Sequence, residues 1–293
     1  MSSTSEQTLD KLTLLISHDR SGSHYLTSFI RALPGQQMID EVCNEQALDP
    51  AKDPLSFFGF RYRLSLSEPD YGLRRNPMIV MNLLDRYFTF VLKSLEPEAV
   101  TIDIKYGHIH NFDIAWWPIF RRPFLFEFCR QRGIKIIHLS RWNSLHAVVS
   151  GEVAESRKIW HAIGKTSPAQ AADAVHLDKQ KVLRQVQSLN QQKDMITRWV
   201  RGLNCHSVLY EELTDAAGGQ DCRARVAEFL GTVPPASFKS PYHKITPPPN
   251  VVVRNWNDIV ALCRENALTQ YVLPHPDRPS IERKDADTVV VEK

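Results

Sequence analysis

The chain contains 293 residues, of which 43% are hydrophobic and 24% are charged, and its formal net charge at pH 7 is +3. These proportions are typical of a globular protein with a large core, and the small, dispersed positive charge argues against nucleic acid as the main partner. Five scattered cysteines without a Cys-x-x-Cys pair favour reduced thiols. No apolar run is long enough for a transmembrane segment and residues 1–10 lack a signal-peptide core, so we expect a soluble, cytoplasmic protein.

The first predicted elements flank a short polar turn. Residues 12–16, Leu-Thr-Leu-Leu-Ile, have the profile of a buried strand, and the apolar residues from Tyr25 to Leu33 fall on one face of a helix that Pro34 ends. Between them lies Arg20-Ser21-Gly22-Ser23. A tight turn between a strand and a helix aims backbone N–H groups and the positive end of the helix dipole at an anion. The turn therefore predicts a phosphate or sulfate site, the alternative being an ordinary turn capped by Ser23.

The next part of the chain contains an irregular stretch between predicted elements. An acidic segment, Ile39 to Glu45, is followed by residues 49–76, whose aromatic and proline content without steady periodicity predicts a long functional loop or small lid. A helix is expected over about 78–95 and a strand over 101–104. The strand leads into Lys105-Tyr106-Gly107-His108, and Trp116 and Trp117 come soon after it.

The second half of the chain repeats the alternation of strands and helices. We expect helices over about 124–132, from 145 onward, over 178–201, ending at Gly231 and over 256–266, and strands over 134–139 and 208–210. Polar residues such as Arg141-Trp142-Asn143 follow these strands. This alternation predicts a single α/β domain with a parallel sheet flanked by helices, and ligands in such sheets bind at the carboxyl ends of the strands.

Two polar junctions together resemble a known family. Arg20-Ser21-Gly22-Ser23 and the later Arg141-Trp142-Asn143 with Ser150 are similar to the motifs of sulfotransferases that use 3'-phosphoadenosine 5'-phosphosulfate. The nearer resemblance is to bacterial carbohydrate and nodulation-factor sulfotransferases. Their Gly-Glu-hydrophobic-Phe-Asn element corresponds to residues 40–44, where Asp40 replaces the glycine and Cys43 the aromatic. Their Tyr-Glu-x-Leu and Phe-Leu-Gly elements correspond to residues 210–213 and 229–231.

The resemblance implies a fold, a domain layout and a donor site. It implies a P-loop-like parallel sheet in a domain over 12–273, between a flexible leader at 1–11 and a polar tail at 274–293, with acceptor-site segments at 46–76 and 106–122. The residues expected to bind 3'-phosphoadenosine 5'-phosphosulfate, or the product adenosine 3',5'-bisphosphate, are Arg20, Ser21, Gly22, Ser23, His24, Tyr25, Arg141, Ser150 and Lys244. Arg20 would act on the transferred group and Arg141 with Ser150 on the 3'-phosphate; the alternative for Arg141 is a surface ion pair.

Two residues are candidates for the catalytic base. Glu41 matches the position of a proposed catalytic glutamate in the bacterial enzymes, and His108 lies near the position of the histidine in cytosolic ones. Lys105 either contacts the sulfuryl oxygens or pairs with a nearby acid. Trp116, Trp117, Phe60 and Tyr62 either line an acceptor pocket or belong to the core. No metal-ligand spacing is present, and no metal is expected.

The expected function is transfer of a sulfuryl group to a hydroxyl or amine of a small natural product, glycolipid or oligosaccharide. One alternative is a non-catalytic module that binds a nucleotide or anion. Another is a kinase-like phosphotransferase with a P-loop, which the sequence disfavours. Gly164-Lys165-Thr166 is its nearest Walker-like stretch, but Ile159 occupies the place of the first glycine.

Overall fold

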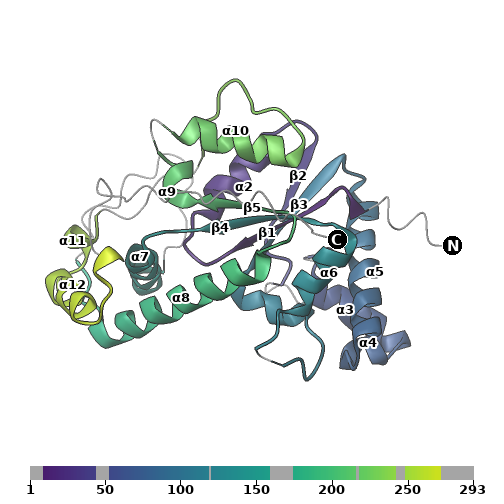
Figure 1. Cartoon of the computed structure of the whole chain (residues 1–293), viewed down its shortest axis with the longest axis horizontal. Coiled ribbons are helices and arrows are strands. Elements are labelled where there is room, and N and C mark those ends of the chain that lie inside the picture. Colours follow the sequence, from purple (N-terminus) through teal and green to yellow (C-terminus); the bar gives the residue numbers. More distant parts are fainter. Residues whose placement is uncertain are drawn as a thin grey trace, which may run out of the picture.

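The fold is built on a parallel sheet. The computed structural model describes residues 9–43, 53–118, 120–158, 174–215, 218–241 and 248–271. In this part of the chain the sheet has five parallel strands in the order β2-β3-β1-β4-β5 (Figure 1). The strands are β1 (Leu12–Ser17), β2 (Gln36–Ile39), β3 (Ala99–Lys105), β4 (Lys135–Ser140) and β5 (Cys205–Leu209). The chain adds strands on one side of β1 and then on the other, so a crevice opens at the carboxyl end of this central strand.

Helices cover both faces of the sheet because successive strand residues point to opposite sides. Leu14 and Ile16 belong to one buried cluster and Leu15 to another. The first cluster includes residues of α5 (Pro77–Leu95) and α6 (Phe124–Arg132), and the second includes residues of α2 (Ser23–Arg31) and α10 (Gly219–Leu230). Figure 1 shows the same three layers, with α2 and α10 opposite α5 and α6. The predicted α/β fold with a parallel sheet flanked by helices is confirmed.

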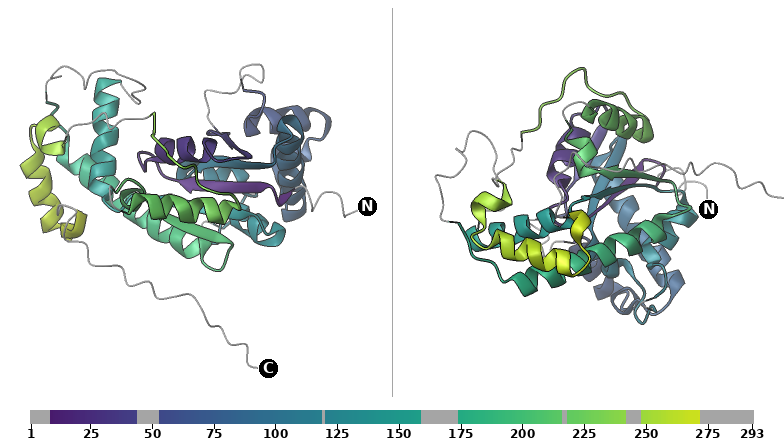
Figure 2. Two further views of the ribbon diagram at one scale, coloured as in Figure 1. Left: turned by 90° about the horizontal axis from the view of Figure 1, so that it is seen from above. Right: turned by 60° about the vertical axis from the view of Figure 1, so that its left-hand side comes forward.

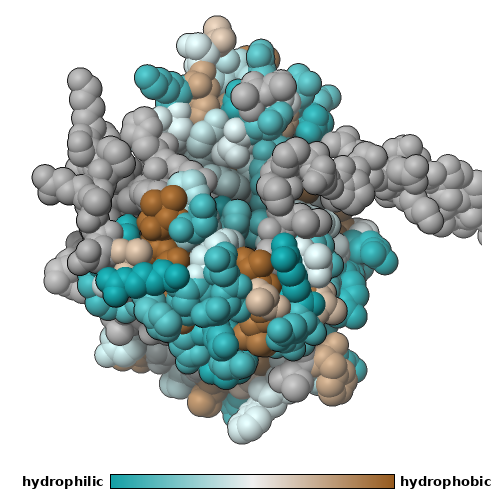
Figure 3. All heavy atoms as spheres, turned by 90° about the vertical axis from the view of Figure 1, so that its left-hand side faces the viewer, coloured by the Kyte–Doolittle hydropathy of each residue, from teal (hydrophilic) through white to brown (hydrophobic). Residues whose placement is uncertain are grey.

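Four further helices gather at the carboxyl ends of the strands. They are α7 (Ser144–Arg157), α8 (Lys179–Val200), α11 (Pro249–Val252) and α12 (Trp256–Glu265), and they share a third buried cluster. Figure 2 shows α7, α11 and α12 at one end of the molecule, with α8 extending back beneath the sheet. There Ile196 and Val200 of α8 join the first cluster. The surface at this end is mainly hydrophilic, with small apolar patches (Figure 3).

The prediction of a long loop over 49–76 is wrong for its described part, whereas the alternative of a small lid stays a prediction. This part contains the helices α3 (Phe57–Ser67) and α4 (Asp70–Leu73), while residues 44–52 lie outside the described residues. Within α3 only Phe57 and Gly59 are buried, so the apolar residues of this helix form no regular stripe that the sequence could reveal. The polar edge strand β2 was likewise not predicted, because it lacks an apolar run. The short elements η2 (Tyr106–Phe112), α9 (Tyr210–Leu213) and η3 (Thr269–Tyr271) complete the description.

The ends of the described chain bear on the predicted domain layout. Leu9 belongs to the segment expected to be a flexible leader, but its side chain is buried in the first cluster and is part of the core. The expected tail at 274–293 lies outside the described residues. All five cysteines are described and are free thiols. None of the helices in the described ranges is long and apolar enough to cross a membrane.

Candidate anion-binding site

The loop after β1 has a backbone shaped for close approach. Arg20 and Gly22 both adopt positive φ angles, 60° and 88°, and α2 begins directly afterwards at Ser23. A Cβ atom on Gly22 would lie 2.1 Å from a ring carbon of Tyr210, so glycine is required by contact as well as by conformation. The hydroxyl of Ser21 is buried and has no hydrogen-bond partner among the described residues. A buried donor without a partner, beside the first turn of a helix, fits an anion at this loop.

Lys105 brings a positive charge to the start of α2. It ends β3 and pairs in register with Ser17 of β1, so its side chain lies beside the loop. Its ammonium group donates to Ser17 Oγ at 3.0 Å and to Ser23 Oγ at 2.9 Å, and it contacts Asp103 Oδ2 at 2.6 Å. The lysine is only 6% exposed. The Lys105 ammonium, which is paired with Asp103, thus lies beside the Ser23 hydroxyl at the start of α2. From there it can stabilise a bound anion.

Glu41 lies next to this lysine. Its Oε1 is 3.6 Å from Lys105 Nζ, and its side chain is 34% exposed. A carboxylate that is partly open to solvent and adjacent to an anion site can accept a proton from an incoming hydroxyl. The structure thus brings one of the two predicted bases to the loop.

His108 lies in η2 and is half-buried, and its Nδ1 is buried without a hydrogen-bond partner in the described chain. Its neighbours Tyr106, Gly107 and His110 line a cavity described below, whereas His108 does not line it. No hydrogen bond or ion pair between His108 and the loop after β1 is found among the described residues. The structure therefore does not place the second predicted base at the anion site in the way that it places Glu41.

Arg20, Arg141 and Ser150 come together as a second group. Arg20 donates from Nε and Nη2 to Ser150 Oγ at 3.2 and 3.1 Å. Arg141 donates to the Arg20 carbonyl at 3.4 Å and stacks over the Tyr210 ring, 4.9 Å from its centroid, while its Nε is buried without a partner. Burial and the charge of Arg141 both lower the pKa of Arg20. A phosphate bound between these two partly buried guanidinium groups would stabilise their charges.

The remaining predicted residues have diverse surroundings. Tyr25 packs edge-on against Phe238, and its hydroxyl accepts from Arg223 Nη1 at 3.1 Å. His24 is half-buried in the first turn of α2, and its carbonyl accepts from Thr27. Lys244 lies outside the described residues. Nothing in the described chain groups three or more potential metal ligands.

Sequence reasoning missed His18, which joins the two loops. Its Nε2 accepts the backbone N–H of Arg141 at 3.1 Å, so Nδ1 carries the proton and donates to the Asp19 carbonyl at 2.7 Å. Burial lowers the pKa of His18 to about 3, which keeps the ring neutral as this pairing requires. The position of His18 directly before Asp19-Arg20 indicates that it lies near the loop. Nothing in the sequence reveals that its partner is Arg141, more than a hundred residues away.

Glu211 and Lys193 hold the second loop from the other side. The Glu211 carboxylate accepts the backbone N–H groups of Trp142 and Asn143 at 2.9 and 3.1 Å. Lys193 of α8 donates to the Trp142 carbonyl at 3.1 Å and to Ser144 Oγ at 2.9 Å. Glu211 belongs to the Tyr-Glu-x-Leu element noted in the sequence, which therefore acts by fixing the loop that carries Arg141. Lys193 lies in an ordinary amphipathic helix pattern, and nothing in that pattern indicates a contact with the second loop.

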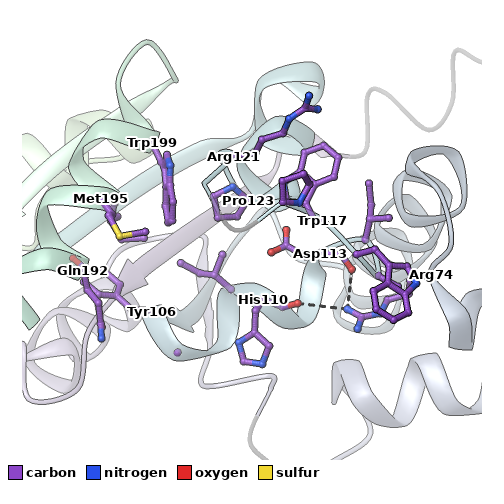
Figure 4. Close-up of a pocket in the computed structure, with 17 residues that line it drawn as sticks. Arg74, Tyr106, His110, Asp113, Trp117, Arg121, Pro123, Gln192, Met195 and Trp199 are labelled. Atoms are coloured by element: carbon purple, nitrogen blue, oxygen red, sulfur yellow. Dashed lines mark hydrogen bonds between the residues drawn. The ribbon is translucent and has the colours of Figure 1, made fainter. Parts of the chain in front are cut away.

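One cavity adjoins the loop after β1, and a second lies beside the first. One, of about 560 Å³, is lined by Arg20 and by residues of α7 and α8. The other, of about 550 Å³, is drawn in Figure 4 and lies between η2, residues 113–123 and α8. Both are lined by Tyr106, Gly107 and Gln192, so the two cavities are neighbours. The second cavity is the more aromatic of the two, because Tyr106, Trp116, Trp117 and Trp199 line it.

The fold and these residues define a parallel α/β protein with two neighbouring groups of cations and polar side chains at the carboxyl edge of its sheet. Comparison with protein-family models gave no match, and comparison with curated proteins gave none. Among solved structures, the chain is similar to mouse sulfotransferase SULT7A1 complexed with PAP, with a TM-score of 0.46 and 13% sequence identity, over 92% of this chain and 88% of that one.

Proposed function

We propose that the protein is a sulfotransferase that uses 3'-phosphoadenosine 5'-phosphosulfate and transfers its sulfuryl group to a hydroxyl or amine of a small molecule, glycolipid or oligosaccharide. The observation that supports this most strongly is the pairing of two anion sites. One is formed by Ser21, the start of α2 and Lys105, and the other by Arg20, Arg141 and Ser150. A donor with separate 5' and 3' phosphate groups has the charge distribution that two such sites match.

In this proposal each group has a defined task. The N–H groups at the start of α2 and the Lys105 ammonium hold the 5' end and stabilise the charge that develops as the bridging oxygen departs. Arg141 and Ser150 bind the 3'-phosphate, beside Arg20, which donates to Ser150. Glu41 accepts the proton of the acceptor hydroxyl. No step in this scheme requires a metal.

The location of the protein is part of the proposal. We place it in the cytoplasm, which is supported by five free cysteines, four of them buried. Acceptors available in that compartment are therefore the ones to test first.

Calorimetric titration tests the donor. We expect adenosine 3',5'-bisphosphate to bind without a metal and ATP with Mg²⁺ to bind at least tenfold more weakly. Incubation with 3'-phosphoadenosine 5'-phosphosulfate and a library of acceptors, read by mass spectrometry, should then yield a sulfated product. Preference for ATP with Mg²⁺ would favour a phosphotransferase, and bisphosphate binding without product from any acceptor would favour a binding module.

A further inference from the structure

Four large apolar side chains of two neighbouring segments lie in contact with solvent. They are Leu73, Met78, Trp116 and Phe120, which are 55%, 78%, 96% and 84% exposed, respectively. The first two flank the connection from α4 to α5, and the other two belong to the loop before α6. The Ala115 N–H donates to the Arg74 carbonyl at 2.9 Å, so the two segments lie side by side, and Figure 1 shows α4 and this loop at the lower edge of the molecule. We refer to these four residues as the exposed apolar patch.

The loop before α6 holds Trp116 in this position. The φ angle of Trp116 is +67°, an uncommon backbone conformation for a large side chain. The loop is fixed on both sides of it, because Arg74 donates to the Asp113 carbonyl at 2.8 Å and the Trp117 indole N–H donates to the Arg122 carbonyl at 2.9 Å. Exposed apolar side chains that gather on one surface mark a place where a partner binds. An exposed indole on an anchored loop therefore indicates an interaction surface.

The segments that carry the exposed apolar patch are positively charged. Residues 71–84 and 114–126 contain no acidic residue and have four arginines, Arg74, Arg75, Arg121 and Arg122. Arg75 and Arg121 are exposed. The adjoining acids are engaged, since Asp70 pairs with Arg75 and Asp113 accepts the Phe124 N–H. Exposed arginines beside tryptophan, phenylalanine, leucine and methionine side chains suit the boundary between the headgroups and the acyl chains of a lipid bilayer.

We propose that the exposed apolar patch and its arginines dock the protein onto an anionic lipid bilayer. Trp116 and Phe120 lie at the level of the headgroups, and Arg75 and Arg121 contact lipid phosphates and carboxylates. A second copy of the chain on the same surface, related by two-fold symmetry, would instead bring these arginines against one another. A nucleic acid offers phosphates to the arginines but no aliphatic surface to the leucine and methionine of the patch. Of these three partners, the bilayer matches both the charge and the apolar side chains.

Flotation with lipid vesicles tests this proposal. We expect the protein to bind vesicles of phosphatidylcholine and phosphatidylserine, mixed at about 3:1, at least tenfold more tightly than vesicles of phosphatidylcholine alone. The double variant Trp116→Ala/Phe120→Ala should bind the mixed vesicles about 10- to 100-fold more weakly, because two large apolar side chains no longer leave water. Arg75→Gln and Arg121→Gln should each weaken binding by about fivefold.

Val233→Ala and Arg184→Gln are the controls. Val233 is 68% exposed after α10 and Arg184 is exposed on α8, so these variants change an apolar and a basic side chain outside the patch. Both should bind the mixed vesicles as the wild-type protein does. Urea denaturation of every variant should give a free energy of unfolding close to that of the wild type, so that weaker vesicle binding reports on the surface alone.

The outcomes distinguish the bilayer from the other partners and from the proposed function. Equal binding to the two kinds of vesicle, or equal binding of the double variant and the controls, would overturn the proposal. Self-association that the double variant abolishes, without vesicle binding, would overturn it in favour of a second copy, and preference for polyuridylate over the mixed vesicles would overturn it in favour of nucleic acid. Vesicle binding that depends on the patch, in a protein that does not bind adenosine 3',5'-bisphosphate, would support the docking surface and overturn the proposed donor.

Discussion

Lys105 and Arg20 are two cations that make different contacts at the carboxyl edge of the sheet. Lys105 is the register partner of Ser17, so its side chain lies directly beside the start of α2. Arg20 lies three residues past the strand end in a left-handed conformation, and its guanidinium reaches Ser150 on α7. The role of Arg20 at the transferred group, which the sequence resemblance implies, stays a prediction, and the contacts place the Lys105 ammonium at the helix start.

Arg141→Ala should weaken binding of adenosine 3',5'-bisphosphate by about tenfold or more, since a hydrogen bond to a charged group contributes about 1.5–3 kcal/mol. Affinity for adenosine 5'-monophosphate, which lacks the 3'-phosphate, should change little. Calorimetry with both nucleotides measures the difference. Arg130→Ala, at an exposed ion pair on α6, serves as the control. Equal losses for the two nucleotides would show that Arg141 does not contact the 3'-phosphate.

Glu41→Gln should lower turnover by about 10²–10⁴-fold while donor affinity stays unchanged, because the amide keeps the shape but cannot accept a proton. His108→Gln should have a smaller effect, since His108 has no hydrogen bond or ion pair with the anion site among the described residues. Single-turnover rates should be measured with an acceptor whose hydroxyl is not acidic. An inactive His108→Gln that still binds donor, beside an active Glu41→Gln, would reverse the assignment.

Gly22→Ala should destabilise the protein by about 1–3 kcal/mol and abolish bisphosphate binding, because its methyl group would overlap the Tyr210 ring. Gly133→Ala is the matched control. Gly133 also has a positive φ, 64°, but a Cβ there meets no atom within 4 Å. Chemical denaturation of both variants separates backbone strain from overlap. Equal stabilities would mean that the ring of Tyr210 moves away without cost.

At the scale of elements, the junctions after β1, β4 and β5 act as one unit. His18 connects the first junction to the second, and Glu211 connects the third to the second. Each link uses a side chain to satisfy backbone N–H groups that a loop would otherwise leave unpaired. The position of Arg141 therefore depends on both neighbouring strands.

Glu211→Gln should destabilise the protein by about 1–3 kcal/mol, because the amide group presents a donor to one of two backbone N–H groups. The neighbouring Glu212 provides the control, because its carboxylate forms a long, partly exposed ion pair, 3.7 Å from Arg225 Nη2. Glu212→Gln should change the free energy of unfolding by less than about 0.5 kcal/mol. Urea denaturation of both variants gives the two free energies of unfolding. Equal values would show that Glu211 does not stabilise the second loop.

At the scale of the whole molecule, two buried histidines link stability to pH. Burial lowers the pKa of His18 to about 3 and of His138 to about 4, and the Tyr106 hydroxyl pairs with His138 at 2.6 Å. Below pH 6.5 the unfolded chain binds protons at these residues and the folded chain does not, so stability falls as pH decreases toward 4. Each histidine contributes about 1.4 kcal/mol per pH unit well below 6.5.

Denaturation at pH 7, 6 and 5 measures this dependence. His138→Gln removes one titrating group, so its loss of stability on acidification should be shallower than that of the wild-type protein. Above pH 7 neither histidine should affect the pH dependence. An unchanged slope in the variant would show that His138 is protonated or exposed in the folded protein.

The sequence by itself determined the elements whose side chains repeat regularly. The alternation of strands and helices, the turn at Arg20 to Ser23 and the polar junction at Arg141 were all predicted, because apolar periodicity and turn chemistry are local properties. The tertiary structure decided what local patterns do not contain. It placed Lys105 beside Ser23, connected His18 to Arg141, formed α3 without an apolar stripe and brought Trp116 to an aromatic chamber. Each of these depends on strand register or on contacts between segments distant in the chain, which only the packed molecule brings together.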